Sequence, residues 1–409
     1  MTLYAKLLAA ACAASLGAPA AAAPDAPPPT RSNAYLHVWA GDADEKDSDF
    51  LAVVDADVNS ATYGQVVATA PVGAKGTMPH HIEYETPPGG MLFANGWKAG
   101  HSFVFDLSDP PRPRLAADFK SAAGYTFPHS FARLPNGNIV ATFQSIGPKY
   151  APPGGLVELD SAGLAVRSTP STTPDFPDEI NWPYSLAVDA SSDRVITTST
   201  DMGMGPGWKS PPTSHVQIWS VSELKLLSSL ALPNSGKGDH HVWPAEPRLL
   251  SDGTVYVNTF TCGLYRVDGI RTDKPVAKFV HAFPGGTSEH DMCAVPIVYG
   301  KYWIQTVGAL NGLVVLDVSD PDRPLEVSRF ALPARFHMPH WLAADRSNGR
   351  VAVTGASDSW VLMLKFDETS GQLSIDQSFG GGAGVSFDRA DWPHGRTGKA
   401  VVHGTVFGG

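Results

Sequence analysis

Histidine recurs at one place in a short phrase that repeats along this chain. In each phrase a histidine, or once a tyrosine, stands ahead of an apolar run, and the steps between successive phrases are 49, 55, 56, 50, 50 and 54 residues. The seven anchor positions are His80, His129, Tyr184, His240, His290, His340 and His394. A repeat of about 50 residues is typical of propeller blades and related arrays. Because every blade places its equivalent residue around one axis, the repeat predicts a ring of imidazoles.

A ring of imidazoles is suited to binding a transition metal. The repeat offers several nitrogen ligands, no thiolate pair and few carboxylates, which favours copper or iron over calcium or magnesium. Copper is the first expectation, because Cu(II) leads the affinity order for nitrogen ligands, and iron is the alternative. Open coordination positions at such a site would admit dioxygen and a small-molecule substrate.

The elements that must hold this ring are short strands. Runs such as 138–143, 194–199, 254–260 and 312–318 are apolar or alternating and are separated by Gly, Asn and Asp turns. Four such strands per repeat predict an all-β, seven-bladed β-propeller. At the chain ends, residues 35–40, 50–56 and 65–70 have the pattern of three strands of a blade, and residues 399–407 that of the missing strand. Pairing the two ends would close the ring and remove its free edges.

Composition excludes some classes of partner. The net charge of -10 argues against nucleic acid and against anionic membrane surfaces. Beyond the first two dozen residues no run of 18 apolar residues occurs, so no membrane span is expected. Of the three cysteines, Cys12 lies in the N-terminal segment, which leaves Cys262 and Cys293 for one disulfide at most.

The N-terminal segment predicts export. Lys6, an apolar stretch and an Ala-rich run give residues 1–23 the pattern of a signal peptide. Residues 24–33 form a proline-rich tether, and residues 34–409 are the expected propeller domain. We therefore expect a protein carried across the inner membrane to the periplasm or the cell exterior.

Each anchor phrase should lie in the innermost strand of its blade, along the central channel. Neighbouring side chains on a strand point to opposite faces, so His80 and His81 could reach one ion only if the strand is bulged there. Five acidic residues near the anchors are candidates to orient imidazoles: Glu83, Glu179, Asp239, Glu289 and Asp291. Cys293 is expected to be buried and inert, with a thiol in the channel as the alternative. Tyr184 is either a hydrogen-bond partner of the ring or a packing aromatic.

Several segments resemble the selenium-binding protein and methanethiol oxidase family. They are residues 51–67, the pair His80-His81, His129, residues 319–324, and His403 followed by Gly408-Gly409. The resemblance implies a seven-bladed propeller that binds copper through His80, His81, His129 and His403. It also implies an enzyme that oxidises methanethiol with dioxygen and water to formaldehyde, hydrogen sulfide and hydrogen peroxide.

The chain departs from the family in two respects. It lacks the cysteines that the family carries after the histidine pair, and it has additional histidines in later blades. The additional residues His241, His290 and His340 form a second candidate set of metal ligands, on the arc expected opposite to the first. With His129, this set would suit an iron-dependent oxygenase resembling the carotenoid- and stilbene-cleaving enzymes. A third alternative is a metal-binding propeller without turnover.

Overall fold

The computed structural model describes residues 33–87, 89–204, 211–236, 241–288 and 290–409. The predicted signal peptide and all but the last residue of the predicted tether lie outside these ranges. In the described part of the chain, no helix is long and apolar enough to cross a membrane.

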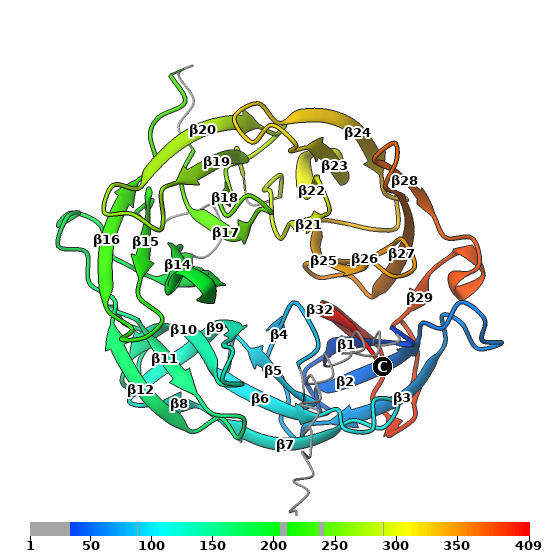
Figure 1. Ribbon diagram of the computed structural model, residues 1–409. Helices are drawn as coiled ribbons and strands as arrows, with labels where there is room; N and C mark the ends of the chain where they lie inside the picture. Colours follow the sequence, from blue (N-terminus) through cyan, green and yellow to red (C-terminus); the bar gives the residue numbers. More distant parts are fainter. Residues whose placement is uncertain (1–32, 88, 205–210, 237–240, 289) are drawn as a thin grey trace, which may run out of the picture. The chain divides into compact units, whose positions relative to one another are not determined.

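Seven antiparallel sheets of four principal strands are arranged as the blades of a propeller (Figure 1). The first three complete blades are β4 Pro79–Ile82, β5 Met91–Gly96, β6 His101–Asp106 and β7 Arg114–Phe119; β9 Tyr125–Arg133, β10 Ile139–Ile146, β11 Gly155–Leu159 and β12 Ala165–Pro170; and β13 Pro183–Asp189, β14 Arg194–Ser199, β15 His215–Trp219 and β16 Leu226–Ala231. The next three are β17 Pro244–Leu249, β18 Val255–Thr259, β19 Gly263–Asp268 and β20 Val276–Ala282; β21 Ile297–Tyr299, β22 Tyr302–Val307, β23 Gly312–Asp317 and β24 Leu325–Ala331; and β25 Pro339–Asp345, β26 Arg350–Gly355, β27 Trp360–Asp367 and β28 Gln372–Ile375.

Short elements decorate this frame. They are the strands β8 Ser121–Ala122, β29 Val385–Ser386, β30 Asp391–Trp392 and β31 Gly395–Arg396, and the 3-10 turns η1 Ala190–Ser192, η2 Met202–Met204, η3 Gly308–Leu310 and η4 Phe379–Gly382. The prediction of an all-β, seven-bladed propeller is confirmed.

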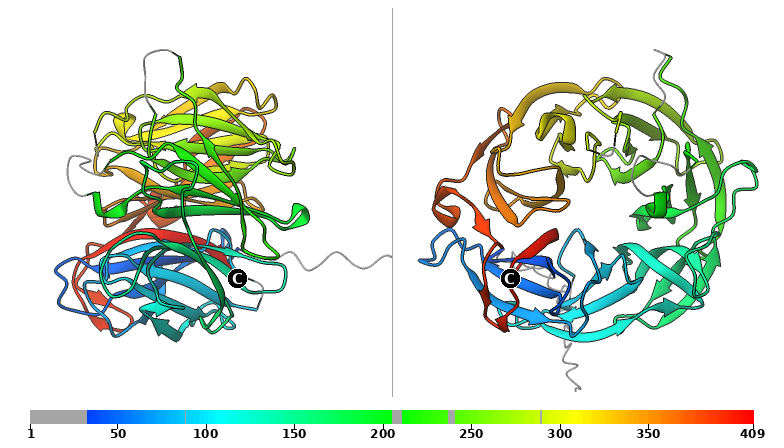
Figure 2. Two further views of the ribbon diagram at one scale, coloured as in Figure 1. Left: turned by 90° about the vertical axis from the view of Figure 1, so that its left-hand side faces the viewer. Right: turned by 180° about the vertical axis from the view of Figure 1, so that it is seen from behind.

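The seventh blade joins the two ends of the chain. Its strand order is β3 (Val66–Pro71), β2 (Phe50–Asp55), β1 (Tyr35–Asp42) and β32 (Ala400–Gly408). Tyr35 pairs with Gly408 and Val38 with Thr405 across the β1–β32 ladder. The predicted closure is therefore confirmed, and β32 is the innermost strand of its blade (Figure 2).

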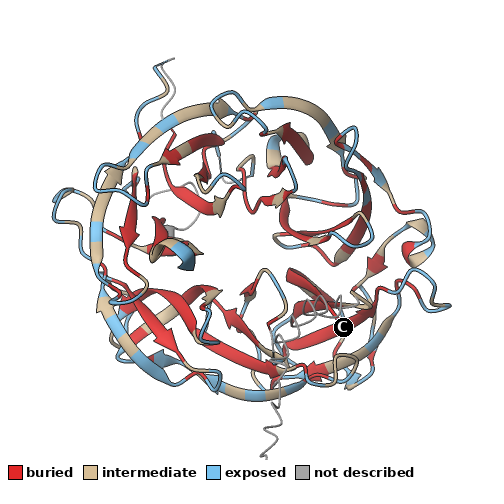
Figure 3. Ribbon diagram, viewed as in Figure 1, coloured by how far each residue is buried: buried red, intermediate tan, exposed pale blue. Residues whose placement is uncertain are grey.

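The burial pattern follows from the stacking of blades. Inner and middle strands such as β2 and β10 are buried over nearly their whole length, because both of their faces pack against neighbouring blades. Outer strands such as β7 alternate between exposed and half-buried residues. Figure 3 shows the same gradient, with buried residues concentrated on the inner strands.

A bulge recurs at the head of the inner strands. In β4, Pro79 pairs with Gly96 and Ile82 with Ala94, so three steps on the inner strand match two on its partner. The same shift occurs between Pro128 and Phe131 of β9, and equivalent shifts occur in β13, β17 and β25. The extra residue lets two successive side chains leave the strand toward the same region. The bulge expected from the His80-His81 pair is thus present.

Candidate metal centre

In several blades a polar side chain on the second strand connects the bulge to the next blade by hydrogen bonds. Asn95 of β5 accepts a hydrogen bond from the His81 backbone N–H at 2.6 Å and donates to the backbone carbonyl of His129 at 3.1 Å. Thr142 of β10 repeats the arrangement, because it accepts from the Ser130 N–H at 3.0 Å and donates to the Tyr184 carbonyl at 2.7 Å. These bonds satisfy buried backbone groups that the bulge removes from the ladder.

This repeated hydrogen-bond pattern and the bulge define which inner-strand residues are structurally equivalent. The first bulge residue of each blade, in chain order around the ring, is His80, His129, Tyr184, Ala245, Ala294, His340 and His403. The ring therefore carries histidine in four neighbouring blades, whose inner strands are β25, β32, β4 and β9 (Figure 1). Tyrosine and two alanines occupy the remaining arc.

Three histidines from β4 and β9 form a first group. One ligand nitrogen from each of His80, His81 and His129 lies within 4.8 Å of the others. The Nε2 atoms of His80 and His129 are 3.1 Å apart, and the ring centres of His81 and His129 are separated by 4.1 Å. All three side chains are buried.

Hydrogen bonds fix the orientation of two of these rings. His129 Nδ1 lies 2.8 Å from the Tyr184 backbone carbonyl, which can only accept, so Nδ1 carries the proton and Nε2 presents its lone pair. His81 Nδ1 is 2.8 Å from the Ser130 hydroxyl. The His81 Nε2 atom has no hydrogen-bond partner among the described residues. The ring of Tyr184 also packs 3.8 Å from that of His129, so Tyr184 both bonds and packs.

A second group shares His80 with the first. Ligand nitrogens of His80, His340 and His403 again lie within 4.8 Å of one another. The His403 ring centre is 4.2 Å from that of His80 and 4.4 Å from that of His340. Three ligand nitrogens of this group have no hydrogen-bond partner in the described part of the chain. They are both ring nitrogens of His340 and the Nδ1 of His403. Thr354 of β26 donates to the backbone carbonyl of His403 and so ties β32 to the blade of His340.

Burial keeps these imidazoles neutral. It lowers the pKa of His129 to about 3, although the Tyr184 carbonyl acts in the opposite direction, and it lowers the pKa of His340 to about 4. Burial, reinforced by repulsion from neighbouring imidazoles, also holds the pKa values of His80, His81 and His403 well below the usual value. Neutral imidazoles with free lone pairs are the form that binds a metal ion.

A buried carboxylate that the sequence reasoning missed lies beside the first group. Glu246 of β17 accepts hydrogen bonds at Oε2 from Tyr84 at 2.6 Å, Ser185 at 2.6 Å and Arg248 at 2.9 Å. Its Oε1 is 4.0 Å from His81 Nε2. Glu246 occupies the bulge position equivalent to His81, and anchoring the repeat on proline instead of histidine would have revealed it.

Aromatic rings cover the carboxylate and the histidines. Tyr84 stacks on Trp341 with ring centres 4.9 Å apart and planes inclined by 5°. The Arg248 guanidinium lies 4.0 Å above the Tyr84 ring, and Trp341 contacts His81 edge-on at 5.0 Å. On the side of His81, the histidine cluster is therefore covered by side chains of three different blades.

The second candidate set does not assemble. His340 joins the first set, because β25 is the neighbour of the closing strand β32 and not part of an opposite arc. His241 precedes β17, directs Nδ1 to the Thr261 carbonyl at 2.7 Å and stacks on Phe279. His290 precedes β21 by seven residues and is exposed. Neither belongs to a metal-binding group of the described residues.

The predicted anchor His394 also lies away from the grouped histidines. His394 lies in the turn between β30 and β31, where its ring nitrogens contact Thr69 and Thr397 at 2.7 and 2.8 Å. In the closing blade, the innermost strand β32 supplies His403 instead. His240 lies outside the described residues.

The acidic candidates have other partners. Glu83 forms an ion pair with Arg133, Glu179 contacts His215, and Asp291 accepts bonds from Thr287 and Ser288. Asp239 and Glu289 lie outside the described residues.

Cys293 is buried, as expected, and the alternative of a thiol in the channel is wrong. Cys293 is disulfide-bonded to Cys262, which lies in the turn between β18 and β19. This bond ties the blade of β17–β20 to the head of β21.

The cluster fits a transition-metal ion. It combines buried, neutral imidazoles with lone pairs that lack partners in the described structure, and such groups are costly to bury unless something binds them. The set has five nitrogen donors and one nearby carboxylate, with no thiolate among the grouped residues. This donor set suits copper, iron or zinc and does not suit calcium or magnesium.

Two curated proteins match part of the sequence. A methanethiol oxidase of Hyphomicrobium sp is 29% identical over 224 residues, which make up 50% of this chain and 50% of that protein. A methanethiol oxidase of Ruegeria pomeroyi is 29% identical over 154 residues, or 36% of this chain and 34% of that protein. The chain thus spans about half the length, or less, of the curated relatives it matches. No protein-family model matches it.

Solved structures share the propeller fold. A hypothetical selenium-binding protein from Sulfolobus tokodaii superposes with a TM-score of 0.70 at 16% identity, covering 93% of this chain and 94% of that one. A periplasmic gluconolactonase from Pseudomonas aeruginosa gives 0.60 at 13% identity, covering 83% and 94%. At such identities the likeness concerns the fold. The two sequence matches, on a fold shared with a selenium-binding protein, support the resemblance of this chain to the selenium-binding protein and methanethiol oxidase family.

Proposed function

We propose that this protein is an exported, copper-dependent oxidase that acts on a small sulfur compound with dioxygen as the oxidant. The observation that carries the proposal is the group of His80, His81 and His129, with His403 adjoining it through His80. The matched sequences, both named methanethiol oxidase, support a thiol as the substrate class.

Copper would be held by His80, His81, His129 and His403. Bound there, it would supply reversible one-electron redox chemistry and a coordination position for a small ligand. His129 would offer Nε2, because its Nδ1 donates to the Tyr184 carbonyl. The absence of a thiolate from the grouped residues leaves a substrate sulfur as the soft donor at the site.

The surrounding side chains position these ligands. Ser130 holds the His81 ring from Nδ1, and the Tyr84–Trp341 stack restricts access of water from that side. Glu246 places a fixed negative charge next to His81, which favours a bound cation. Its three donors prevent the carboxylate from swinging away.

Export is part of the proposal. It rests on the signal-like pattern of residues 1–23 and on the Cys262–Cys293 disulfide, since disulfides persist mainly in oxidising compartments.

The iron-oxygenase alternative receives less support. It required His241 and His290 to converge with His129 and His340, and those two residues lie outside the grouped histidines. Copper held by the first set is therefore the function we retain.

The test is reconstitution followed by oxygen uptake. Metal-free protein is loaded with copper, iron or zinc, and dioxygen consumption is measured with methanethiol and longer alkanethiols, together with release of hydrogen sulfide and hydrogen peroxide. We expect turnover with copper only, and its loss in His129→Ala with retention in His394→Ala. Copper-loaded protein that consumes no oxygen with any thiol would contradict the proposal.

A further inference from the structure

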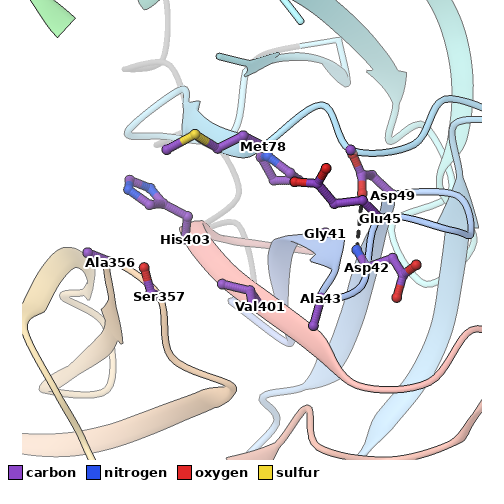
Figure 4. A pocket seen from close by; sticks show the side chains of 12 residues that line it. Gly41, Asp42, Ala43, Glu45, Asp49, Met78, Ala356, Ser357, Val401 and His403 are labelled. Atoms are coloured by element: carbon purple, nitrogen blue, oxygen red, sulfur yellow. Dashed lines mark hydrogen bonds between the residues drawn. The ribbon is translucent and has the colours of Figure 1, made fainter. Parts of the chain in front are cut away.

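A surface pocket reaches His403, one of the three histidines of the second group. It has a volume of about 160 Å³ and lies where the closing blade meets its two neighbours. Its lining includes Asp42, Met78, Pro79, Ala356 and His403 (Figure 4). His403 is 4% exposed, and its Nδ1 has no hydrogen-bond partner in the described structure. A buried histidine of the second group thus belongs to the wall of a cavity that reaches exposed residues.

A thioether stands at the outer end of this pocket. Met78 is 45% exposed, and in Figure 4 its side chain extends to the same side of the pocket as the His403 ring. Its backbone has a φ of 59°, in the left-handed region that is unfavourable for a residue with a side chain. The carbonyl of Met78 is held by the Trp97 N–H at 2.9 Å. The fold therefore maintains this residue in a fixed, strained position at the entrance.

The same backbone conformation recurs in other blades with different side chains. Four residues with positive φ precede the inner-strand prolines: Met78, Phe127, Trp243 and Met338. Methionine occupies this position in the two blades that flank the closing blade, and aromatic residues occupy it in the other two. The Met338 carbonyl accepts a bond from the N–H of Ala356, which lines the pocket. The conformation belongs to the fold, whereas the sulfur is specific to the blades beside His403.

The charge at the entrance attracts cations. Residues 42–49 contain five carboxylates and one lysine. Three of the carboxylate residues, Asp42, Glu45 and Asp49, line the pocket, and Glu45 is paired with Lys98. A mouth with this excess of negative charge raises the local concentration of cations. Thioether sulfur selects Cu(I) among the biological metal ions.

We propose that this pocket is a loading port for Cu(I), in which the Met78 thioether captures the ion and passes it to His403, His340 and His80. The second histidine group then binds the incoming ion first. His80, which belongs to both groups, connects it to His81 and His129. His340 is the donor that the family resemblance did not include, and both of its nitrogens are available for this step. The inference rests on copper as the metal of the proposed function.

The test is the rate of metal uptake by metal-free protein. Cu(I) is presented anaerobically as its complex with a coloured chelator, and loss of the complex is followed by stopped-flow absorbance. Met78→Leu, which keeps the side-chain volume, should slow uptake by about tenfold while leaving the final copper content unchanged. Met91→Leu, at the other end of β5 from this pocket, is the matched control and should load at the wild-type rate.

Two further experiments distinguish copper entry through this pocket from copper binding at the histidine cluster. His340→Ala should also slow Cu(I) uptake, whereas Met78→Leu should take up Cu(II) at the wild-type rate, because thioether selectivity applies to the softer ion. Equal Cu(I) uptake rates in wild type, Met78→Leu and His340→Ala would overturn the port and leave the copper site intact. Wild-type protein that binds no copper at equilibrium would overturn the port and the proposed function together.

Discussion

Glu246 Oε1 and His81 Nε2 face each other across 4.0 Å at the centre of the propeller. Neither atom has a hydrogen-bond partner within the described residues. The other oxygen of Glu246 accepts bonds from Tyr84, Ser185 and Arg248. The carboxylate is therefore held with one oxygen directed at the histidine cluster, where it can compensate part of the charge of a bound cation.

Replacing Glu246 should weaken metal binding. Glu246→Gln keeps the shape of the side chain and removes its charge, so we expect copper affinity to fall by 10- to 100-fold, as is typical when a carboxylate next to a ligand is lost. Competition titration against a copper chelator measures the change. An affinity equal to that of wild type would contradict the role of Glu246.

The Glu83–Arg133 pair provides the control for this experiment. Glu83 is a second buried carboxylate paired with an arginine, with N–O contacts of 3.1 and 2.9 Å, and among the described residues it belongs to neither group that could hold a metal ion. Glu83→Gln and Glu246→Gln should each lower the free energy of unfolding, by about 2 kcal/mol, since each removes the charge that pairs with a partly buried arginine. Only Glu246→Gln should alter copper affinity.

The disulfide should contribute measurably to stability. Cys262 and Cys293 are separated by 31 residues, and closing a loop of this length is expected to stabilise the fold by about 4 kcal/mol. Urea unfolding with and without reductant measures this difference. The Cys262→Ala/Cys293→Ala variant should match the reduced protein and should not respond to reductant; a wild-type protein insensitive to reduction would contradict the prediction.

Acid should destabilise the metal-free protein. Burial lowers the folded-state pKa of His37 to about 4, of His129 to about 3 and of His340 to about 4, all below the unfolded value of 6.5. Between these values the unfolded chain binds more protons than the folded one, so stability is fully present above about pH 6.5 and is lost as pH falls toward 4. A shift of this size corresponds to about 3 kcal/mol for one group.

Unfolding free energies measured from pH 7 to pH 4 test this dependence. His340→Leu should flatten the pH profile because it removes one of the titrating groups. His337→Leu, three residues earlier and exposed, is the control and should keep the wild-type slope. A free energy independent of pH over this interval would be inconsistent with buried, neutral histidines.

The propeller could be predicted because its signals are local. Strand runs and turns recur at regular spacing, and the incomplete blades at the two ends matched each other. His80, His129 and His340 could be located because each follows a proline that opens an inner strand. These features depend on neighbouring residues and on a repeat that sequence displays directly.

The remainder of the site depends on register, which sequence alone did not determine. The repeat was aligned on its histidines, which selected His241 and His290, although both precede their strands. The residues that occupy the ring positions in those blades are Ala245 and Ala294. Glu246 was missed for the same reason. That His340 adjoins His403 follows from the pairing of β32 with β1, which places the last blade beside the chain end.

The most direct test of the central claim is the position of copper in crystals of the reconstituted protein. Diffraction data collected at the copper absorption edge should give an anomalous peak with ligand nitrogens of His80, His81, His129 and His403 about 2.0 to 2.2 Å away. Absence of a peak from the histidine cluster in copper-loaded protein, or a peak bound only by residues elsewhere, would contradict the account.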